Sequence, residues 1–224
     1  MMLIRPNADR IDRSLVRSLQ EIEPATVGHF LPSGCMKSEF RPSIDEARIA
    51  GQAVTLRVPS IDSTLCHKVV EIAQPGDVIV IDRCGDTTHA CWGAAMTLAA
   101  SLKGIAGAVI DGSVTDILDI RRMGFPVFYR RLSPLTTRIL GLEGEINVAV
   151  QCGGIIVNPG DLVIADINGV CVLPPGSAQA VIDHAFQEQE KEKIQFLEMK
   201  KGARLASLSG ADGKIPPEAF REQV

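Results

Sequence analysis

Residues 75–82 read PGDVIVID, a turn tripeptide followed by an unbroken apolar run and an acid. Proline fixes φ, glycine accepts a positive φ, and aspartate can bond back to the turn backbone. Strands that are apolar at every position are typically buried on both faces. The same order recurs at residues 159–166, which read PGDLVIAD. The two copies predict a core with internal pseudo-symmetry.

Between the two copies, helical and strand patterns alternate. The pattern predicts helices over 87–102 and 115–123 and strands over 106–110 and 126–129, with short strands only from 146 to 173. A β-α-β-α-β run implies a partly parallel sheet with right-handed crossovers. The fold class is therefore α/β.

The flanking segments complete a single predicted domain over residues 1–224, with a core at about 26–174. Apolar spacing predicts an N-terminal helix within 9–22, its periodic part over 12–22, which Pro24 stops. A strand pair or one long strand is expected over 48–58, a helix over 62–72 capped by Asp62, and a long polar helix over 177–201 before a polar tail.

Composition excludes several functions. The 224 residues are 46% hydrophobic with a net charge of −4 and no Lys/Arg stripe, so we expect no nucleic-acid partner. No signal peptide is visible, and the apolar runs are too short to cross a bilayer, which favours a cytoplasmic protein without a membrane partner. The six cysteines form no CxxC pair, and we interpret them as small buried hydrophobes rather than zinc ligands.

Two loops at strand ends are candidate sites, residues 82–88 and 111–116. The carboxyl ends of strands in α/β sheets open a ligand crevice. Free N–H groups at a helix start attract anions, and Mg²⁺ prefers oxygen ligands. Asp111 and Asp116 could hold a cation there, or could simply be a turn acid and a helix-start acid.

Four groups of residues together resemble one known family. They are GIAGAVIDGSVTD at 104–116, GFPVF at 124–128 with Ser133-Pro134, PGD at 75–77 with Gly85-Asp86 and Trp92-Gly93, and Gly153-Gly154 with PGD at 159–161 and DINGV at 166–170. In order and spacing, from about Thr26 to Gly202, the chain resembles the family of 4-hydroxy-4-methyl-2-oxoglutarate aldolase and the regulator of ribonuclease E activity A.

The resemblance implies an α/β/β/α swivelling-domain fold, with mixed sheets and flanking helices, assembled as a homotrimer or hexamer. It implies a divalent cation, Mg²⁺ or Mn²⁺, and a lyase chemistry that releases pyruvate from a small 2-oxo acid through an enolate, by aldol cleavage or by decarboxylation of oxaloacetate. By position, Asp116 is the metal residue, and Glu192 is the acid contributed by a neighbouring subunit. The substrate cradle corresponds to Gly93, Ala94, Ala95 and Met96.

The sequence departs from the family pattern at three positions. Thr115 replaces an arginine that would grip the substrate, and a threonine hydroxyl cannot replace that charge. Ala94 replaces an acid that often follows the cradle glycine, and Asn168 replaces a turn aspartate. We expect the aldolase reaction to be slow unless Arg83, Arg121 or Arg122 reaches the site.

Two functions therefore remain open. One is a metal-dependent lyase in which Asp116 binds the cation, the cradle N–H groups hold the carboxylate and Thr115 supplies a hydroxyl contact. The other is a non-catalytic oligomeric protein that binds a partner. His89 is a candidate base or ligand, or a surface histidine, and His29 takes a place where the family often has an acid. No GxGxxG or Walker loop is present, which argues against a methyltransferase or an ATP enzyme.

Overall fold

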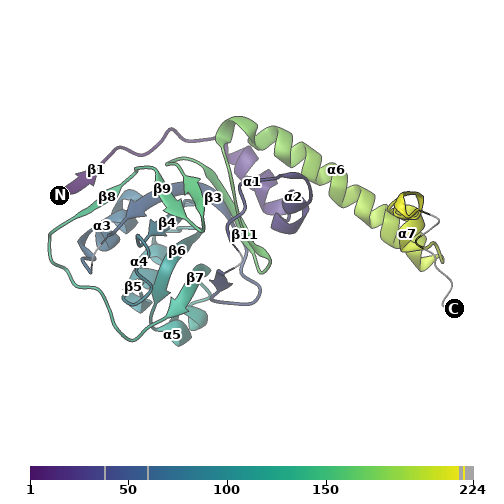
Figure 1. Cartoon of the computed structure of the whole chain (residues 1–224). Helices are drawn as coiled ribbons and strands as arrows, with labels where there is room; N and C mark the ends of the chain where they lie inside the picture. The colour runs from purple at the N-terminus through teal and green to yellow at the C-terminus, as the bar shows by residue number, and fades with distance from the viewer. Residues whose placement is uncertain (38, 60, 217–218, 220–224) are drawn as a thin grey trace.

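The computed structural model describes residues 1–37, 39–59, 61–216 and 219. Over these residues the chain forms a mixed α/β fold built on a large twisted sheet (Figure 1). The main path of the sheet runs β1 (Met2–Ile4), β8 (Gly144–Ile146), β3 (Ile49–Arg57), β4 (Val78–Asp82), β6 (Gly107–Val114), β7 (Val127–Leu132) and β2 (Arg41–Pro42). Strands β3, β4, β6 and β7 are parallel neighbours, as the alternation of helices and strands predicts.

Strand β3 is shared by two halves of the sheet. Its second half, from Ala53 to Arg57, pairs in parallel with β4, whereas its first half pairs antiparallel with β11 (Leu162–Asp166). Strand β11 continues into β12 (Gly169–Leu173). The two PGD copies thus introduce the two strands, β4 and β11, that flank β3 along different parts of its length.

The two PGD turns have the same hydrogen bonds. In each, the backbone N–H three residues before the aspartate donates to its carboxylate at 2.8 Å, Gln74 to Asp77 and Asn158 to Asp161. The glycines of the two turns have φ of 86° and 89°, a region that favours glycine. The turn chemistry predicted from the sequence is confirmed at both places.

Three apolar clusters separate four layers. The first lies between the sheet and the helices α3 (Thr64–Ile72), α4 (Ala94–Leu102) and α5 (Ile117–Arg122). The second lies between the other face of β4, β6 and β7 and the strands β9 (Val150–Cys152), β11 and β12. The third packs the outer face of β11 and β12 against α1 (Arg13–Glu21), α2 (Pro24–Phe30) and α6 (Pro175–Lys200). This α/β/β/α order confirms the predicted fold class.

Two local predictions were wrong, and one helix was not predicted. Helix α1 ends at Glu21, before Pro24 as predicted, but Pro24 then opens α2, because proline at the first helical position loses no hydrogen bond. The segment predicted as one helix over 87–102 contains strand β5 (Ala90–Trp92), which pairs with β6, and only then α4. Strand β6 runs to Val114, so Asp111 lies in a strand and not in a loop.

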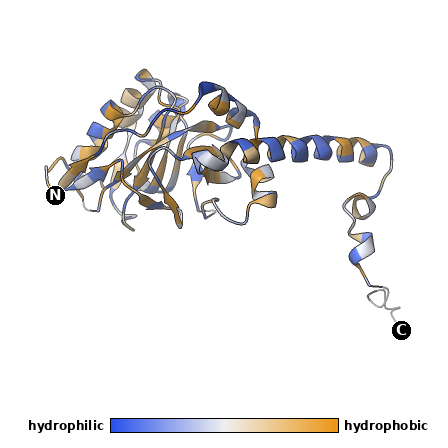
Figure 2. Ribbon diagram, turned by 90° about the horizontal axis from the view of Figure 1, so that it is seen from above, coloured by the Kyte–Doolittle hydropathy of each residue, from blue (hydrophilic) through white to orange (hydrophobic). Residues whose placement is uncertain are grey.

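Helix α6 has two parts. Its first turns bury Ala178, Val181, Ile182 and Ala185 against β11, β12, α1 and α2. The remainder extends beyond the body of the molecule towards α7 (Leu205–Leu208) and is largely hydrophilic, with hydrophobic positions between (Figures 1 and 2). Ile194 and Leu197 in this part are more than half exposed.

Asp62 is a buried acid that holds the segment after β7 against α3. Its carboxylate accepts hydrogen bonds from Thr64, through both N–H and hydroxyl, and from the N–H groups of Leu140, Leu142 and Glu143. Burial by itself would raise the pKa of Asp62, but the hydrogen bonds outweigh it and lower the pKa. The ionised carboxylate is therefore a structural anchor.

We expect Asp62→Ala to lower the free energy of unfolding by about 3 kcal/mol at pH 7, because several buried N–H groups lose their acceptor. The folded state lowers the pKa of Asp62, so its contribution is present above the unfolded value of about 3.9 and lost as the pH falls below it. Urea unfolding at pH 7 and pH 3 measures both effects. The exposed Asp183→Ala is the control and should change little; equal stability of Asp62→Ala and wild type would contradict the anchor role.

Candidate functional site

Asp116 stands between β6 and α5 in a left-handed backbone conformation, with φ 53° and ψ 35°. Aspartate is one of the few non-glycine residues that adopt this region readily, and such conformations gather at functional sites. Its side chain turns away from its own helix, α5, and its Oδ2 accepts the backbone N–H of Ala94, the first residue of α4, at 3.0 Å. The residue is exposed rather than directed into the interior.

The start of α4 is built around this carboxylate. Thr115 donates its N–H to the carbonyl of Trp92 at 2.9 Å, which ties the end of β6 to the end of β5. Trp92 is buried and fixed by a 2.8 Å bond from its indole N–H to the Thr97 hydroxyl. Gly93 sits between them, and a Cβ there would lie 2.6 Å from Asp116 Oδ2. Only glycine allows the carboxylate to approach the helix start this closely.

The cradle predicted at residues 93–96 is the first turn of α4. Asp116 occupies the N–H of Ala94, while the N–H groups of Ala95 and Met96 have no partner among the described residues. First-turn N–H groups lack intrahelical acceptors, so these two can receive an anion. The side chains of Ala95 and Met96 instead line a separate cavity of about 220 Å³ against α3.

A cavity of about 230 Å³ opens beside Asp116, between the residues 114–117 and 132–134. Among the described residues, Asp116 Oδ1 has one hydrogen-bond partner, the Thr115 hydroxyl, which donates to it at a long 3.3 Å. Within the described part of the chain, no three His, Cys, Asp or Glu side chains gather around one point. A single carboxylate with open space fits a hydrated Mg²⁺-type ion, which keeps several waters, and not a cation such as Zn²⁺ that needs a full set of protein ligands.

The three arginines that might have replaced the missing family arginine are engaged elsewhere. Arg83 is fully buried and bonds the carbonyl of Val58 and the carboxylate of Asp86. Arg121 donates to the carbonyl of Ser43, and Arg122 pairs with Asp119. Each of these guanidinium groups is therefore held by other partners and does not take the place of the arginine that the family resemblance implies at position 115.

The other acids at the sheet edge hold loops. Asp82 Oδ2 accepts the N–H of Gln151 at 3.1 Å, and Asp111 Oδ2 accepts the N–H of Gly153 at 2.8 Å. Both bonds fasten the hairpin of β9 and β10 (Ile155–Val157) to the carboxyl edge of the sheet. Asp111 is not the turn acid of the alternative interpretation, because it lies within β6; its second oxygen pairs with Arg130.

The remaining candidates lie apart from Asp116 within this chain. His89 Nδ1 is 3.0 Å from Asp86 Oδ2, and burial would raise the pKa of Asp86, but the N–H groups of Thr88 and His89, the His89 ring and Arg83 lower it to about 2. His29 is exposed on α2, in the layer opposite α4 and α5. Glu192 lies on the extending part of α6, away from the sheet.

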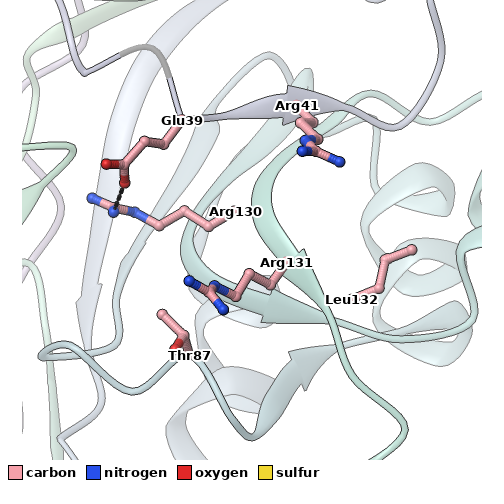
Figure 3. Close-up of a pocket in the computed structure, with 6 residues that line it drawn as sticks. All are labelled: Glu39, Arg41, Thr87, Arg130, Arg131 and Leu132. Carbon is pink, nitrogen blue, oxygen red and sulfur yellow. Dashed lines mark hydrogen bonds and ion pairs between the residues drawn. The ribbon is translucent and has the colours of Figure 1, made fainter.

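A larger cavity of about 590 Å³ lies near the edge strand β2 and its neighbour β7 (Figure 3). Arg130 lines this cavity, forms ion pairs with Glu39 and Asp111, and lies over the ring of Phe40. Arg41 and Arg131 have no carboxylate partner among the described residues. Leu132 borders both this cavity and the one beside Asp116. Arg131 was not among the residues predicted from the sequence, although the doublet Arg130-Arg131 stands directly before the Leu-Ser-Pro segment.

Gly93→Ala tests the tight contact at the start of α4. The added Cβ would lie 2.6 Å from Asp116 Oδ2 and 2.8 Å from Thr115 Cγ2, so the carboxylate must move. We expect divalent-cation affinity to fall at least tenfold while the fold survives, as measured by Mn²⁺ titration and circular dichroism. Gly176→Ala, where a Cβ meets open space, is the matched control. Undiminished Mn²⁺ binding by Gly93→Ala would contradict the predicted role of this contact.

The fold and this loop-to-helix site define a class of protein. Residues 25–172 match the model of the RraA-like family, described as Aldolase/RraA, and the chain belongs to that family. A Halalkalibacterium halodurans protein, provisionally named a 4-hydroxy-4-methyl-2-oxoglutarate aldolase, is 35% identical over 77% of this chain and 86% of its own length. The Thermus thermophilus protein named 4-hydroxy-4-methyl-2-oxoglutarate aldolase is 34% identical over 60% of this chain and 81% of its own.

The solved structures point to the same family. RraAS2 of Streptomyces coelicolor, described as an unusual member of the RNase ES inhibitor RraA protein family, superimposes with a TM-score of 0.77. It is 31% identical and covers 84% of this chain and 98% of its own. The relatives therefore include a protein named as an aldolase and a member of a family described as RNase ES inhibitors. Among the described residues, no helix is long and apolar enough to span a membrane.

Proposed function

We propose that the protein is a divalent-metal-dependent lyase that releases pyruvate from a small 2-oxo acid, of the 4-hydroxy-4-methyl-2-oxoglutarate aldolase or oxaloacetate decarboxylase type. One observation carries the proposal. Asp116 is held in a left-handed conformation with one carboxylate oxygen on the start of α4 and the other facing an open cavity. A protein that needed only a helix cap would not require the exposed oxygen or the close approach that Gly93 permits.

Each group of the site has a task in this reaction. A bound Mg²⁺ or Mn²⁺ would supply Lewis-acid stabilisation of the enolate oxygen. Asp116 would hold that cation, and the N–H groups of Ala95 and Met96 would donate hydrogen bonds to the substrate carboxylate. Thr115 offers a neutral hydroxyl at the position of the family arginine. Arg131, near the mouth of the site, adds positive charge that attracts an anionic substrate.

The extending part of α6 supports a homo-oligomer. Its exposed Ile194 and Leu197 are apolar positions that a neighbouring subunit would cover, and the helix reaches far beyond its own sheet. In a trimer or hexamer, Glu192 of one chain would come to the Asp116 site of the next and act as a proton carrier. The site is then incomplete in a single chain.

The second candidate function is a non-catalytic oligomeric binding protein. Thr115 and Ala94 favour it, because both positions have lost a charged group that serves the reaction in the aldolase pattern. The name of the Streptomyces coelicolor relative is consistent with this reading. The retained Asp116 and Gly93 favour the lyase.

Pyruvate release separates the two functions. The purified full chain should release pyruvate from oxaloacetate or from 4-hydroxy-4-methyl-2-oxoglutarate in a lactate dehydrogenase-coupled assay, only with Mg²⁺ or Mn²⁺, and chelation with EDTA should stop it. No turnover above the metal-only background with either substrate would reject the lyase and leave the binding protein.

A further inference from the structure

Two cysteines that are 136 residues apart in the sequence lie side by side in the third layer. Cys35 follows α2, Cys171 lies in β12, and their backbones form an isolated antiparallel bridge. The N–H after each cysteine donates to the carbonyl before the other, at 2.8 and 2.7 Å. This pattern makes them a non-hydrogen-bonded pair, the arrangement in which facing side chains are closest.

The sulfur atoms are already near bonding distance. Cys35 Sγ and Cys171 Sγ are 2.7 Å apart, less than 1 Å longer than a disulfide bond of about 2.05 Å. Bridged residues of such a pair have Cα separations of about 4.5 Å, within the range that disulfides span. Closing the bond therefore requires the sulfur atoms to approach by less than 1 Å, without a rearrangement of the backbone.

The two thiols differ in access and acidity. Cys35 is exposed and lines a cavity of about 200 Å³, whereas Cys171 is 2% exposed. The hydrogen bond with Cys171 lowers the pKa of Cys35 to about 7 against the opposing effect of burial, and the same bond raises the pKa of Cys171. An accessible thiolate beside a shielded thiol is the arrangement of an attacking and a resolving cysteine.

We propose that Cys35 and Cys171 form an oxidative modification site that closes to a reversible disulfide when a peroxide reaches Cys35. The Cys35 thiolate attacks one oxygen of hydrogen peroxide, the O–O bond breaks, and the products are a sulfenic acid and hydroxide. The sulfur of Cys171, losing its proton, then attacks the Cys35 sulfur and the S–O bond breaks, releasing water. Two thiols lose two electrons in total, and the peroxide is reduced to two waters.

The disulfide would join the segment after α2 to the sheet. It closes a loop of more than 100 residues, which restricts the unfolded chain strongly. We expect the oxidised protein to melt about 5–10 °C higher than the reduced protein. The crosslink would hold residues 34–36 against β12. The Asp116 site lies in the other half of the molecule and would not be part of the crosslinked region.

The structure provides internal controls. Cys66 and Cys91 also influence each other's pKa, but both are buried, so peroxide cannot reach them. Cys84 is exposed without a second cysteine recorded beside it, and burial is the main cause that raises its pKa. Variants at these positions distinguish oxidation of the Cys35–Cys171 pair from oxidation of the protein's cysteines in general.

The test uses the full-length chain, treated with equimolar hydrogen peroxide and analysed by intact mass, non-reducing peptide mapping and thermal melting. Wild type, Cys66→Ser and Cys84→Ser should each lose about 2 Da, yield a Cys35–Cys171 linked peptide and return to the reduced mass with dithiothreitol. Cys171→Ser should accumulate a sulfenic acid that dimedone traps, and Cys35→Ser should not react.

Three results would overturn the proposal. They are a wild-type chain that gains oxygen without losing 2 Da, a linked peptide that joins other cysteines or two chains, and a Cys35→Ser chain that still forms the intramolecular link. Cys35→Ala and Cys171→Ala repeat the test if a serine variant fails to fold. The readouts are covalent and do not depend on whether the protein is a lyase.

Discussion

Asp116→Asn should reduce magnesium-dependent pyruvate release by about 10³-fold, the scale on which removal of one electrostatic contact to a developing negative charge acts. Asparagine also adopts the left-handed conformation, and its amide oxygen can still accept the N–H of Ala94. The substitution thus removes the charge that holds the cation while it leaves the helix start intact. Initial rates with oxaloacetate over a Mg²⁺ series measure the effect.

The matched control for this prediction is Asp119→Asn. Asp119 is an exposed acid one turn further along the same helix, and it pairs only with Arg122 among the described residues. Its replacement should leave the rate within about twofold of wild type. If Asp116→Asn keeps full turnover with unchanged Mg²⁺ dependence, the cation is not bound at Asp116 and the proposed chemistry is wrong.

Thr115→Arg should raise the rate of pyruvate release by about 10²-fold. Thr115 borders the cavity beside Asp116, and its backbone is fixed by the bond to the Trp92 carbonyl, so a longer side chain starts from the correct place. A guanidinium offers two parallel donors to a carboxylate or enolate oxygen, whereas the hydroxyl offers one neutral donor. The gain should appear in kcat/KM for oxaloacetate.

Two further variants resolve the cause of that gain. Thr115→Lys restores the charge without the planar donor pair, so its gain should be smaller than that of arginine. Thr115→Val keeps the shape and removes the hydroxyl, and it should be slower than wild type. An arginine variant no faster than valine would show that this position does not face the reacting substrate.

Much of the fold was predictable because it follows from local chemistry. Residues that lie close together in sequence determine the two PGD turns, the apolar strands after them and the helices α3, α5 and α6. Strand β5 was missed because residues 90–92 form a strand only by pairing with β6, a tertiary effect that overrides the helical pattern. The extension of β6 through Asp111 was not predicted, for the same reason.

The site was predictable in part. Asp116 and Gly93 were found through the motifs that carry the family resemblance, but their mutual contact spans two elements and has no signal in a single sequence. The guanidinium groups of Arg83, Arg121 and Arg122 are held by hydrogen bonds to partners such as Asp86 and Ser43. These contacts are likewise visible only in three dimensions. The pairing of Cys35 with Cys171 could not be predicted, because it depends on how the fold brings together two residues that are 136 positions apart.

A cation site at Asp116 is measured by Mn²⁺ binding to the wild-type chain and to Asp116→Asn, followed by water-proton relaxation. We expect one ion per chain at millimolar metal, with water molecules still in rapid exchange, and its loss in the variant. Equal binding by the two proteins, or no ion bound by wild type at millimolar Mn²⁺, would contradict a cation site at the junction of β6 and α5.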